Sequence, residues 1–86
     1  MARADEFLHV TIRARDGIRF QGDAKSVSSI NQKGTFDILP EHANFICTIE
    51  KRVWVQTKEG KQEEFSLENG VLHVSEDNVV VYLEIK

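Results

Sequence analysis

Apolar and polar side chains alternate one by one through almost all of this 86-residue chain, and this alternation limits what the chain can fold into. Residues 7–13 read FLHVTIR and residues 79–85 read VVVYLEI. A period of two places successive side chains on opposite faces of a β-strand. No segment sustains the 3.6-residue period of a helix. The pattern therefore predicts an all-β domain of antiparallel strands.

Short polar runs, several containing glycine, divide the alternating segments. They are Arg15–Gly17, Gly22–Asp23, Asn31–Gly34, Lys58–Lys61, Glu68–Gly70 and Ser75–Asn78, and the only proline, Pro40, ends one strand. Glycine and asparagine in such runs favour tight turns. We expect about eight to ten short strands, a spacing typical of a sandwich or barrel. Residues 40–44 are the one place where a helical turn could form.

Length and charge narrow the classes of protein further. A chain of 86 residues predicts one domain, covering residues 1–86. The net charge of −3 argues against a nucleic-acid surface and against docking on anionic lipid. A single cysteine, Cys47, excludes an internal disulfide. No apolar run approaches the roughly 20 residues needed to span a bilayer, and residues 1–6 lack the apolar stretch of a secretory signal.

The residues that could carry chemistry are scattered. His9, His42 and His73 lack the close pairing that metal ligands show in sequence. Cys47 lies in an apolar strand, where a small buried thiol is the ordinary interpretation. The adjacent carboxylates of Glu63 and Glu64 would point to opposite faces of a strand and so cannot act on one bond. We expect no catalytic residue, no metal and no cofactor.

Residues 34–45, which read GTFDILPEHANF, are the unusual segment. A short apolar strand runs into a corner at Pro40, whose ring fixes φ and stiffens the chain. The corner presents Glu41 and His42 between two apolar side chains, Leu39 and Phe45. It could be a defined protein contact or a plain crossover between two sheets, and the residues alone favour neither.

This segment resembles a motif of ATP synthase epsilon subunits, which are called delta in mitochondria. The family motif reads Gly-x-x-Gly-Ile-Leu-Pro-Gly-His-Ala-Pro, and it is matched in order and spacing by Gly34, Ile38, Leu39, Pro40, His42 and Ala43. Residues 16–22, 24–29, 63–74 and 78–83 resemble further strands of the same β-sandwich, so the similarity covers nearly the whole chain.

The chain departs from the family pattern at four positions. Asp37, Glu41 and Asn69 replace glycines, and Asn44 replaces the second proline of the motif. Aspartate and asparagine tolerate a left-handed backbone better than most residues. We therefore expect Asp37 and Asn69 to keep the family geometry and the corner at Glu41 to differ from it.

The resemblance implies an antiparallel β-sandwich of two roughly five-stranded sheets. Family members usually add a C-terminal helical hairpin that inhibits ATP hydrolysis and, in some bacteria, binds ATP. The 86 residues end with the last predicted strand, so we expect the hairpin to be absent. The resemblance then gives no grounds for inhibition or nucleotide binding.

The resemblance also implies a function: a non-catalytic subunit of the rotating central stalk, peripheral on the cytoplasmic side of the energy-transducing membrane. It would link the gamma subunit to the c-ring and couple proton transport to ATP synthesis, without inserting into lipid. The contact with the c-ring would be made by Asn31, Gln32, Lys33, Gly34, Leu39, Pro40, Glu41 and His42. The contact with gamma would be made by a sheet face displaying Val27, Val80 and Tyr82.

The alternative function is a free-standing β-sandwich module that binds a peptide or a carbohydrate. Such a module would need a groove lined with exposed aromatic side chains.

Overall fold

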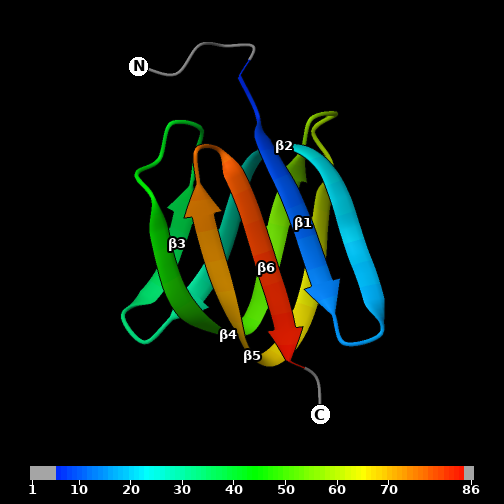
Figure 1. The fold of residues 1–86 in the computed structure, drawn as a ribbon, viewed down its shortest axis with the longest axis vertical. Coiled ribbons are helices and arrows are strands. Elements are labelled where there is room, and N and C mark those ends of the chain that lie inside the picture. The colour runs from blue at the N-terminus through cyan, green and yellow to red at the C-terminus, as the bar shows by residue number, and fades with distance from the viewer. Residues whose placement is uncertain (1–5, 85–86) are drawn as a thin grey trace.

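The computed structural model describes residues 6–84, and these form six β-strands and no helix (Figure 1). The strands are β1 (Leu8–Ala14), β2 (Gly17–Asn31), β3 (Gly34–Ile38), β4 (Phe45–Thr57), β5 (Gln62–Ser75) and β6 (Asn78–Glu84). The predicted all-β class is confirmed. The described residues accordingly contain no helix that could cross a membrane.

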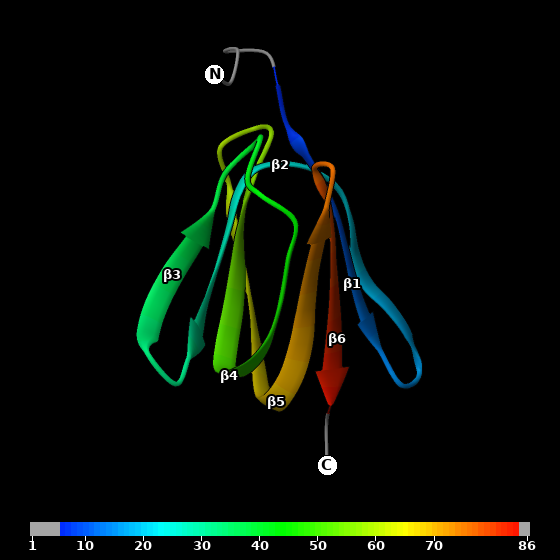
Figure 2. The same ribbon diagram turned by 60° about the vertical axis from the view of Figure 1, so that its left-hand side comes forward.

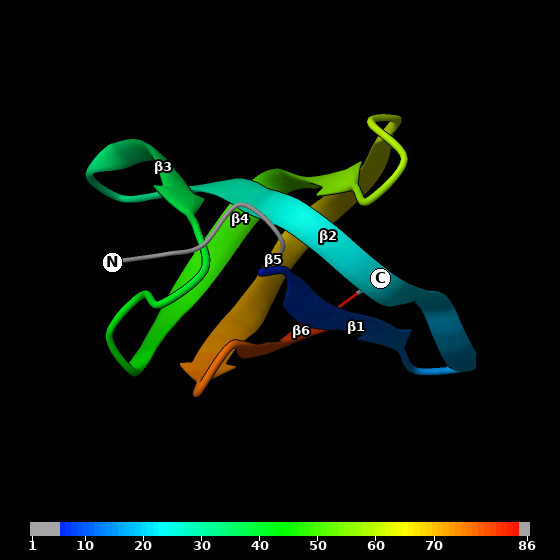
Figure 3. The same ribbon diagram turned by 90° about the horizontal axis from the view of Figure 1, so that it is seen from above.

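One continuous sheet, in the order β1-β6-β5-β4-β2-β3, folds over itself into two layers (Figure 3). It closes on one side because β1 also pairs with β2. All neighbouring strands are antiparallel except β1 and β6. Residues His9–Arg13 of β1 run parallel to residues Asn78–Tyr82 of β6. This pair departs from the predicted antiparallel pattern because β1 starts beside the β5–β6 turn, where the His9 N–H donates to the Asp77 carbonyl at 2.8 Å.

Three strands are much longer than expected and bend from one layer into the other (Figure 2). β2, β4 and β5 have 15, 13 and 14 residues. The register of β2 shifts between Ala24 and Ser26, and that of β4 between Ile49 and Lys51. Such bulges bend a strand while its ladder continues. Counting each half of a bent strand separately is what gave eight to ten short strands.

Two of the predicted breaks are therefore wrong, at residues 22–23 and 68–70, because the strands continue through both. The other turns are confirmed: residues 15–16, 32–33, 58–60 and 76–77 all reverse the chain. Residues 40–44 form a turn, in which the His42 N–H donates to the Leu39 carbonyl at 3.1 Å, and no helix.

The core fills the space between the inner faces of the two layers. Its buried members are Leu8, Val10, Ile12, Ala24, Val27, Ile38, Ile49, Val53, Val55, Leu67, Leu72, Val74, Val79, Val81 and Leu83. Each fully buried aliphatic side chain of this size contributes about 1.5–3 kcal/mol. The rings of Phe36 and Phe45 pack edge to face, with their centroids 6.0 Å apart, on the side where the two layers are not joined.

Candidate partner-binding surfaces

The outer surface of the layer formed by β1, β6, the second half of β5 and the first half of β4 carries an apolar face. We define the apolar face by Ile46, Val71, Val80 and Tyr82. Ile46 is 67% exposed and Tyr82 52%, while the two valines are half-buried. Cross-strand pairing joins Val71 to Tyr82. The exposed His73 pairs with both Ile46 and Val80 and so lies between them on this face. Single exposed apolar side chains are common, but several on one sheet face mark an interaction surface.

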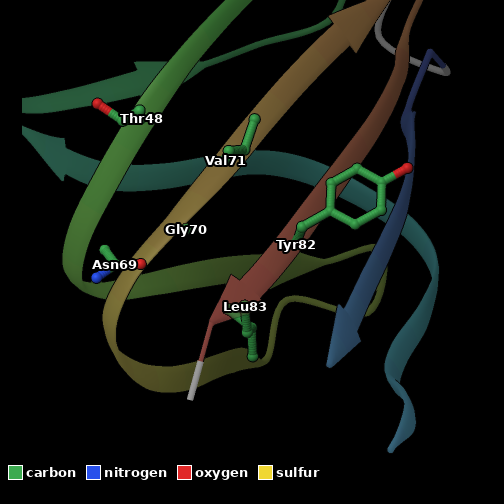
Figure 4. Close-up of a pocket in the computed structure, with 6 residues that line it drawn as sticks. All are labelled: Thr48, Asn69, Gly70, Val71, Tyr82 and Leu83. Carbon is green, nitrogen blue, oxygen red and sulfur yellow. The ribbon is translucent and has the colours of Figure 1, made fainter. Parts of the chain in front are cut away.

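A groove of about 350 Å³ crosses the apolar face (Figure 4). It is lined by Thr48, Asn69, Gly70, Val71, Tyr82 and Leu83. The Tyr82 ring stands on one side of it and Val71 lies on the strand beside it. Tyrosine combines apolar area with a hydroxyl and is enriched among the residues that dominate binding energy. The groove can receive one apolar side chain of a partner protein.

Two of the three residues predicted for the gamma contact lie on the apolar face, namely Val80 and Tyr82. The third does not, since Val27 is fully buried in the core. The bulge between Ala24 and Ser26 shifts the alternation of β2 and turns Val27 inward. Sequence reasoning missed Ile46, although the apolar run at the start of β4 was the signal for it.

The turn that connects β2 to β3 is one of the two regions predicted for the c-ring contact. Gln32 and Lys33 are exposed at its tip. The Lys33 N–H donates to the Asn31 side-chain oxygen at 2.8 Å, and Gly34 has φ +121°, a value that favours glycine. This local bond and the glycine hold the tip in one conformation.

The corner at Pro40 is the other predicted region, and it lies at the opposite end of β3 (Figure 1). Leu39 is 56% exposed, Glu41 is exposed, and Pro40 and His42 are half-buried. The five residues of β3 separate the two regions by roughly 16 Å at strand rise. The structure therefore does not bring the two regions together.

The corner is fastened to the β5–β6 turn by two hydrogen bonds, an arrangement we call the corner clip. The Glu41 N–H donates to the Asp77 carboxylate at 2.7 Å, and the Glu76 N–H donates to the Asn44 side-chain oxygen at 3.1 Å. Glu41, Glu76 and Asp77 all have left-handed backbone, with φ 67°, 50° and 68°. Sequence reasoning did not find this clip, because its partners are more than thirty positions apart.

Comparison with known proteins places the fold in a family. The model of the ATP synthase delta/epsilon chain β-sandwich domain matches residues 7–85. The chain belongs to this family. It is similar to the ATP synthase epsilon chains of a Nitratiruptor species, with 32% identity, and of Sulfurimonas denitrificans, with 36% identity. Each match covers 90% of this chain and 60% of the relative, so the chain spans about 60% of the length of these proteins.

Solved structures show the same fold. A chain of the Euglena gracilis mitochondrial ATP synthase superposes with a TM-score of 0.84 at 15% identity, covering 95% of this chain and 53% of that one. A chain of the Tetrahymena thermophila mitochondrial ATP synthase central stalk and c-ring superposes with a TM-score of 0.78 at 9% identity, covering 92% of this chain and 64% of that one.

The departures from the epsilon motif now have a structural account. Glu41 has a left-handed backbone, with φ 67°, a conformation that glycine adopts most readily. Asp37 and Asn69 lie in strands and have no left-handed backbone. Asp37 instead accepts a hydrogen bond from the Ser28 hydroxyl across the β2–β3 pair.

The titratable groups of this epsilon-type domain are dispersed in the described residues. The exposed side chains of His9 and Asp23 interact through Nδ1 and Oδ1, which are 2.7 Å apart. No group of three His, Cys, Asp or Glu in the described part of the chain is arranged to hold a metal ion. Burial raises the pKa of the Cys47 thiol, and a hydrogen bond with the Asn31 side chain opposes that rise. A thiol in this environment is a weak nucleophile near neutral pH.

Proposed function

We propose that this chain is the β-sandwich of a non-catalytic central-stalk subunit of an F-type ATP synthase. It links the gamma subunit to the c-ring, on the cytoplasmic side of the energy-transducing membrane, and couples proton transport to ATP synthesis. The apolar face carries the proposal, because an epsilon-type domain that presents it needs a protein partner to cover it. The names of the relatives, ATP synthase epsilon chains, support the choice of complex.

The gamma subunit is assigned to the apolar face. Removing apolar area from water contributes about 25 cal/mol per Å², and the ring of Tyr82 and the side chain of Ile46 supply much of that area. Arg13 pairs with Tyr82 across the β1–β6 ladder and is exposed at the rim. A gamma segment that fits this face carries an apolar residue for the groove and an acidic residue opposite Arg13.

The c-ring is assigned to the turn Asn31–Gly34 alone. The two predicted regions lie at opposite ends of β3, roughly 16 Å apart, and we assign the corner at Pro40 to a different contact. That corner leads directly into Ile46 of the apolar face. It therefore joins the gamma contact, where Leu39 extends the apolar area.

The test is binding to purified gamma subunit by calorimetry. The unmodified chain is expected to bind with a Kd below about 1 μM, or roughly −8 kcal/mol. Tyr82→Asp places a charge on the apolar face and is expected to weaken binding at least about tenfold. Gln56→Asp is the control, because Gln56 is exposed but pairs with Ser26 and Gln62 in the other layer. Equal binding by both variants rules out this face, and no binding by the folded unmodified chain rules out the function.

The alternative, a module that binds peptide or carbohydrate, needs exposed aromatic rings that share a groove. Tyr82 lies on the outer face of one layer, whereas Trp54 pairs with Ser28 and Glu64 in the other. The two rings therefore face opposite sides of the sandwich. This arrangement favours the stalk function.

A further inference from the structure

Besides the outer edges of β2 over residues 17–22 and of β5 over residues 62–68, two strand edges in the described part of the chain have no neighbouring strand (Figures 1 and 3). One is the outer edge of β3. The other is the outer edge of the first half of β4, since β4 pairs with β2 only from Glu50 onward. Both edges lie on the side where the two layers are not joined.

The ladder determines which backbone groups of β4 point outward. The two-residue turn after Ser75 makes Ser75 and Asn78 a hydrogen-bonded pair, and such pairs alternate along antiparallel strands. Alternate residues of β5 bond to β6, and the residues between them, Gly70, Leu72 and Val74, bond to β4. Their partners on β4 are Ile49, Cys47 and Phe45. The N–H and C=O groups of Ile46 and Thr48 therefore face away from the sheet.

The β4 edge lacks two of the features that protect edge strands from pairing, namely charge and proline, although it is five residues long and a bulge follows it between Ile49 and Lys51. Charged residues, proline, bulges and short length are the usual protection. Residues 45–49 read FICTI, with no charge, no proline and no glycine. By contrast, the equally short β3 carries the charged Asp37 at a position whose backbone groups face away from β2, and it begins with Gly34.

The same segment is apolar on both faces. Ile46 is the most exposed of the large hydrophobic residues that the structure describes, at 67% on the outer face. On the inner face, Phe45 and Cys47 are only half-buried. Apolar residues on both faces are typical of strands that are covered on both sides, so this edge has the composition of an interior strand.

We propose that an extended segment of the partner chain adds to the outer edge of β4 as a further strand, bonding to the backbone of Ile46 and Thr48. This inference rests on the proposed function for the identity of the partner, the gamma subunit. Strand addition draws affinity from main-chain hydrogen bonds and specificity from alternate side chains. The added strand places one row of apolar side chains over Phe45 and Cys47.

A second copy of this chain fits the edge less well. Pairing two β4 edges would extend the sheet sideways and leave the apolar face of each copy in water. A single partner that runs along the edge and continues over Tyr82 covers both surfaces at once. The apolar face and the edge share Ile46, so one partner can reach both.

Amide hydrogen exchange, measured on the chain free and bound to gamma, tests the proposal directly. The amides of Ile46 and Thr48 are expected to exchange rapidly in the free chain and to slow by about a hundredfold in the complex, as hydrogen-bonded amides do. The amides of Cys47 and Ile49 already bond to β5 and serve as internal controls that are slow in both states.

Proline substitution removes the outward N–H. Thr48→Pro is expected to weaken gamma binding at least about tenfold, because it removes a main-chain hydrogen bond and its ring blocks the edge. Thr48→Val keeps the N–H but also changes a side chain that lines the groove, so it is expected to weaken binding less than Thr48→Pro does. Thr35→Pro removes an outward N–H at the edge of β3 and is expected to leave gamma binding unchanged.

The outcomes separate this inference from the proposed function. If gamma binds and Tyr82→Asp weakens it, but exchange at Ile46 and Thr48 is unaltered, strand addition is wrong and the stalk function stands. If the chain dimerises without gamma and these two amides become protected, the occupant is a second copy and the inference is overturned. If gamma does not bind, the proposed function fails first. Should Thr48→Pro not fold, the exchange measurement on the unmodified chain decides.

Discussion

Gly70 lies inside β5, beside the backbone of Tyr82 on β6. A Cβ at this position would lie 2.3 Å from the Tyr82 carbonyl oxygen and 2.8 Å from Cδ1 of Leu67. The leucine methyl can move, but the carbonyl belongs to the sheet backbone. Gly70 also lines the groove on the apolar face. One glycine thus serves both the fold and the surface.

Gly70→Ala is therefore expected to lower the free energy of unfolding by about 2–3 kcal/mol, because an inserted methyl forces the β5 and β6 backbones apart. Urea denaturation measures the change. Gly22→Ala is the matched control within a strand: its nearest neighbour is a ring carbon of Phe20 at 3.7 Å, an ordinary contact. It should cost less than about 1 kcal/mol. Equal losses in the two variants would contradict the account of Gly70.

The Cys47 thiol has a pKa raised by burial in the folded chain. Its thiolate is accordingly scarcer than in the unfolded chain, and alkylation by iodoacetamide at pH 8.5 should be slower in buffer than in urea. Since the folded state holds this proton more tightly, stability should decline as the pH rises through the ordinary cysteine range near 8.5. Cys47→Ser, which lacks the thiol, should lose this part of the pH dependence. Faster alkylation in the folded state would exclude a buried thiol.

Among the elements, the corner clip shows how a loop without regular structure is held. Asp77 contributes twice: its carboxylate accepts the Glu41 N–H, and its carbonyl accepts the His9 N–H. Three left-handed residues in one small region store strain that these bonds must offset. The clip thus fixes the position from which β4 enters the apolar face.

Asp77→Ala is expected to destabilise the fold by about 1–2 kcal/mol, since it removes the acceptor for Glu41 and places alanine in a left-handed conformation. Asp77→Asn keeps an acceptor oxygen and tolerates that conformation, so it should cost less than about 0.5 kcal/mol. Thermal unfolding of the two variants gives the comparison. A large loss in Asp77→Asn would show that the carboxylate charge, and not its geometry, stabilises the corner.

Local rules predicted the local features of these elements well. Alternation identified the strands, and the turns at residues 15–16, 32–33 and 76–77 followed from their polar residues. The signal at Asn69–Gly70 failed because this glycine is required by a close approach of two strands, which local sequence does not encode. The corner clip and the burial of Val27 depend on pairings across the sheet and on a bulge, so the sequence alone could not place them.

For the molecule as a whole, the sandwich separates two ends. The turn Asn31–Gly34 lies at one end and the corner at Pro40 at the other, each joined to a different end of β3. The family resemblance suggested both for the c-ring, and their places at opposite ends of β3 are the basis on which we propose two separate contacts.

Cysteine cross-linking in the assembled ATP synthase checks this division. In a Cys47→Ser background, Lys33→Cys is expected to cross-link to a c subunit and Leu39→Cys to gamma, because the two side chains are exposed at opposite ends. Gln56→Cys reports the background from an exposed side chain outside both assigned contacts. Cross-links from both Lys33→Cys and Leu39→Cys to the same c subunit would contradict the assignment.

The parallel pairing of β1 with β6 also sets an order of events during folding. His9 and Asn78 are about seventy positions apart, yet they are neighbours in the closed sheet. Contacts of such long range form late and slow the folding of β-proteins. During synthesis, β1 can form its hairpin with β2 early, but its other edge stays open until β6 has left the ribosome. The β1–β2 hairpin therefore depends, for its final neighbour, on a strand that is made much later.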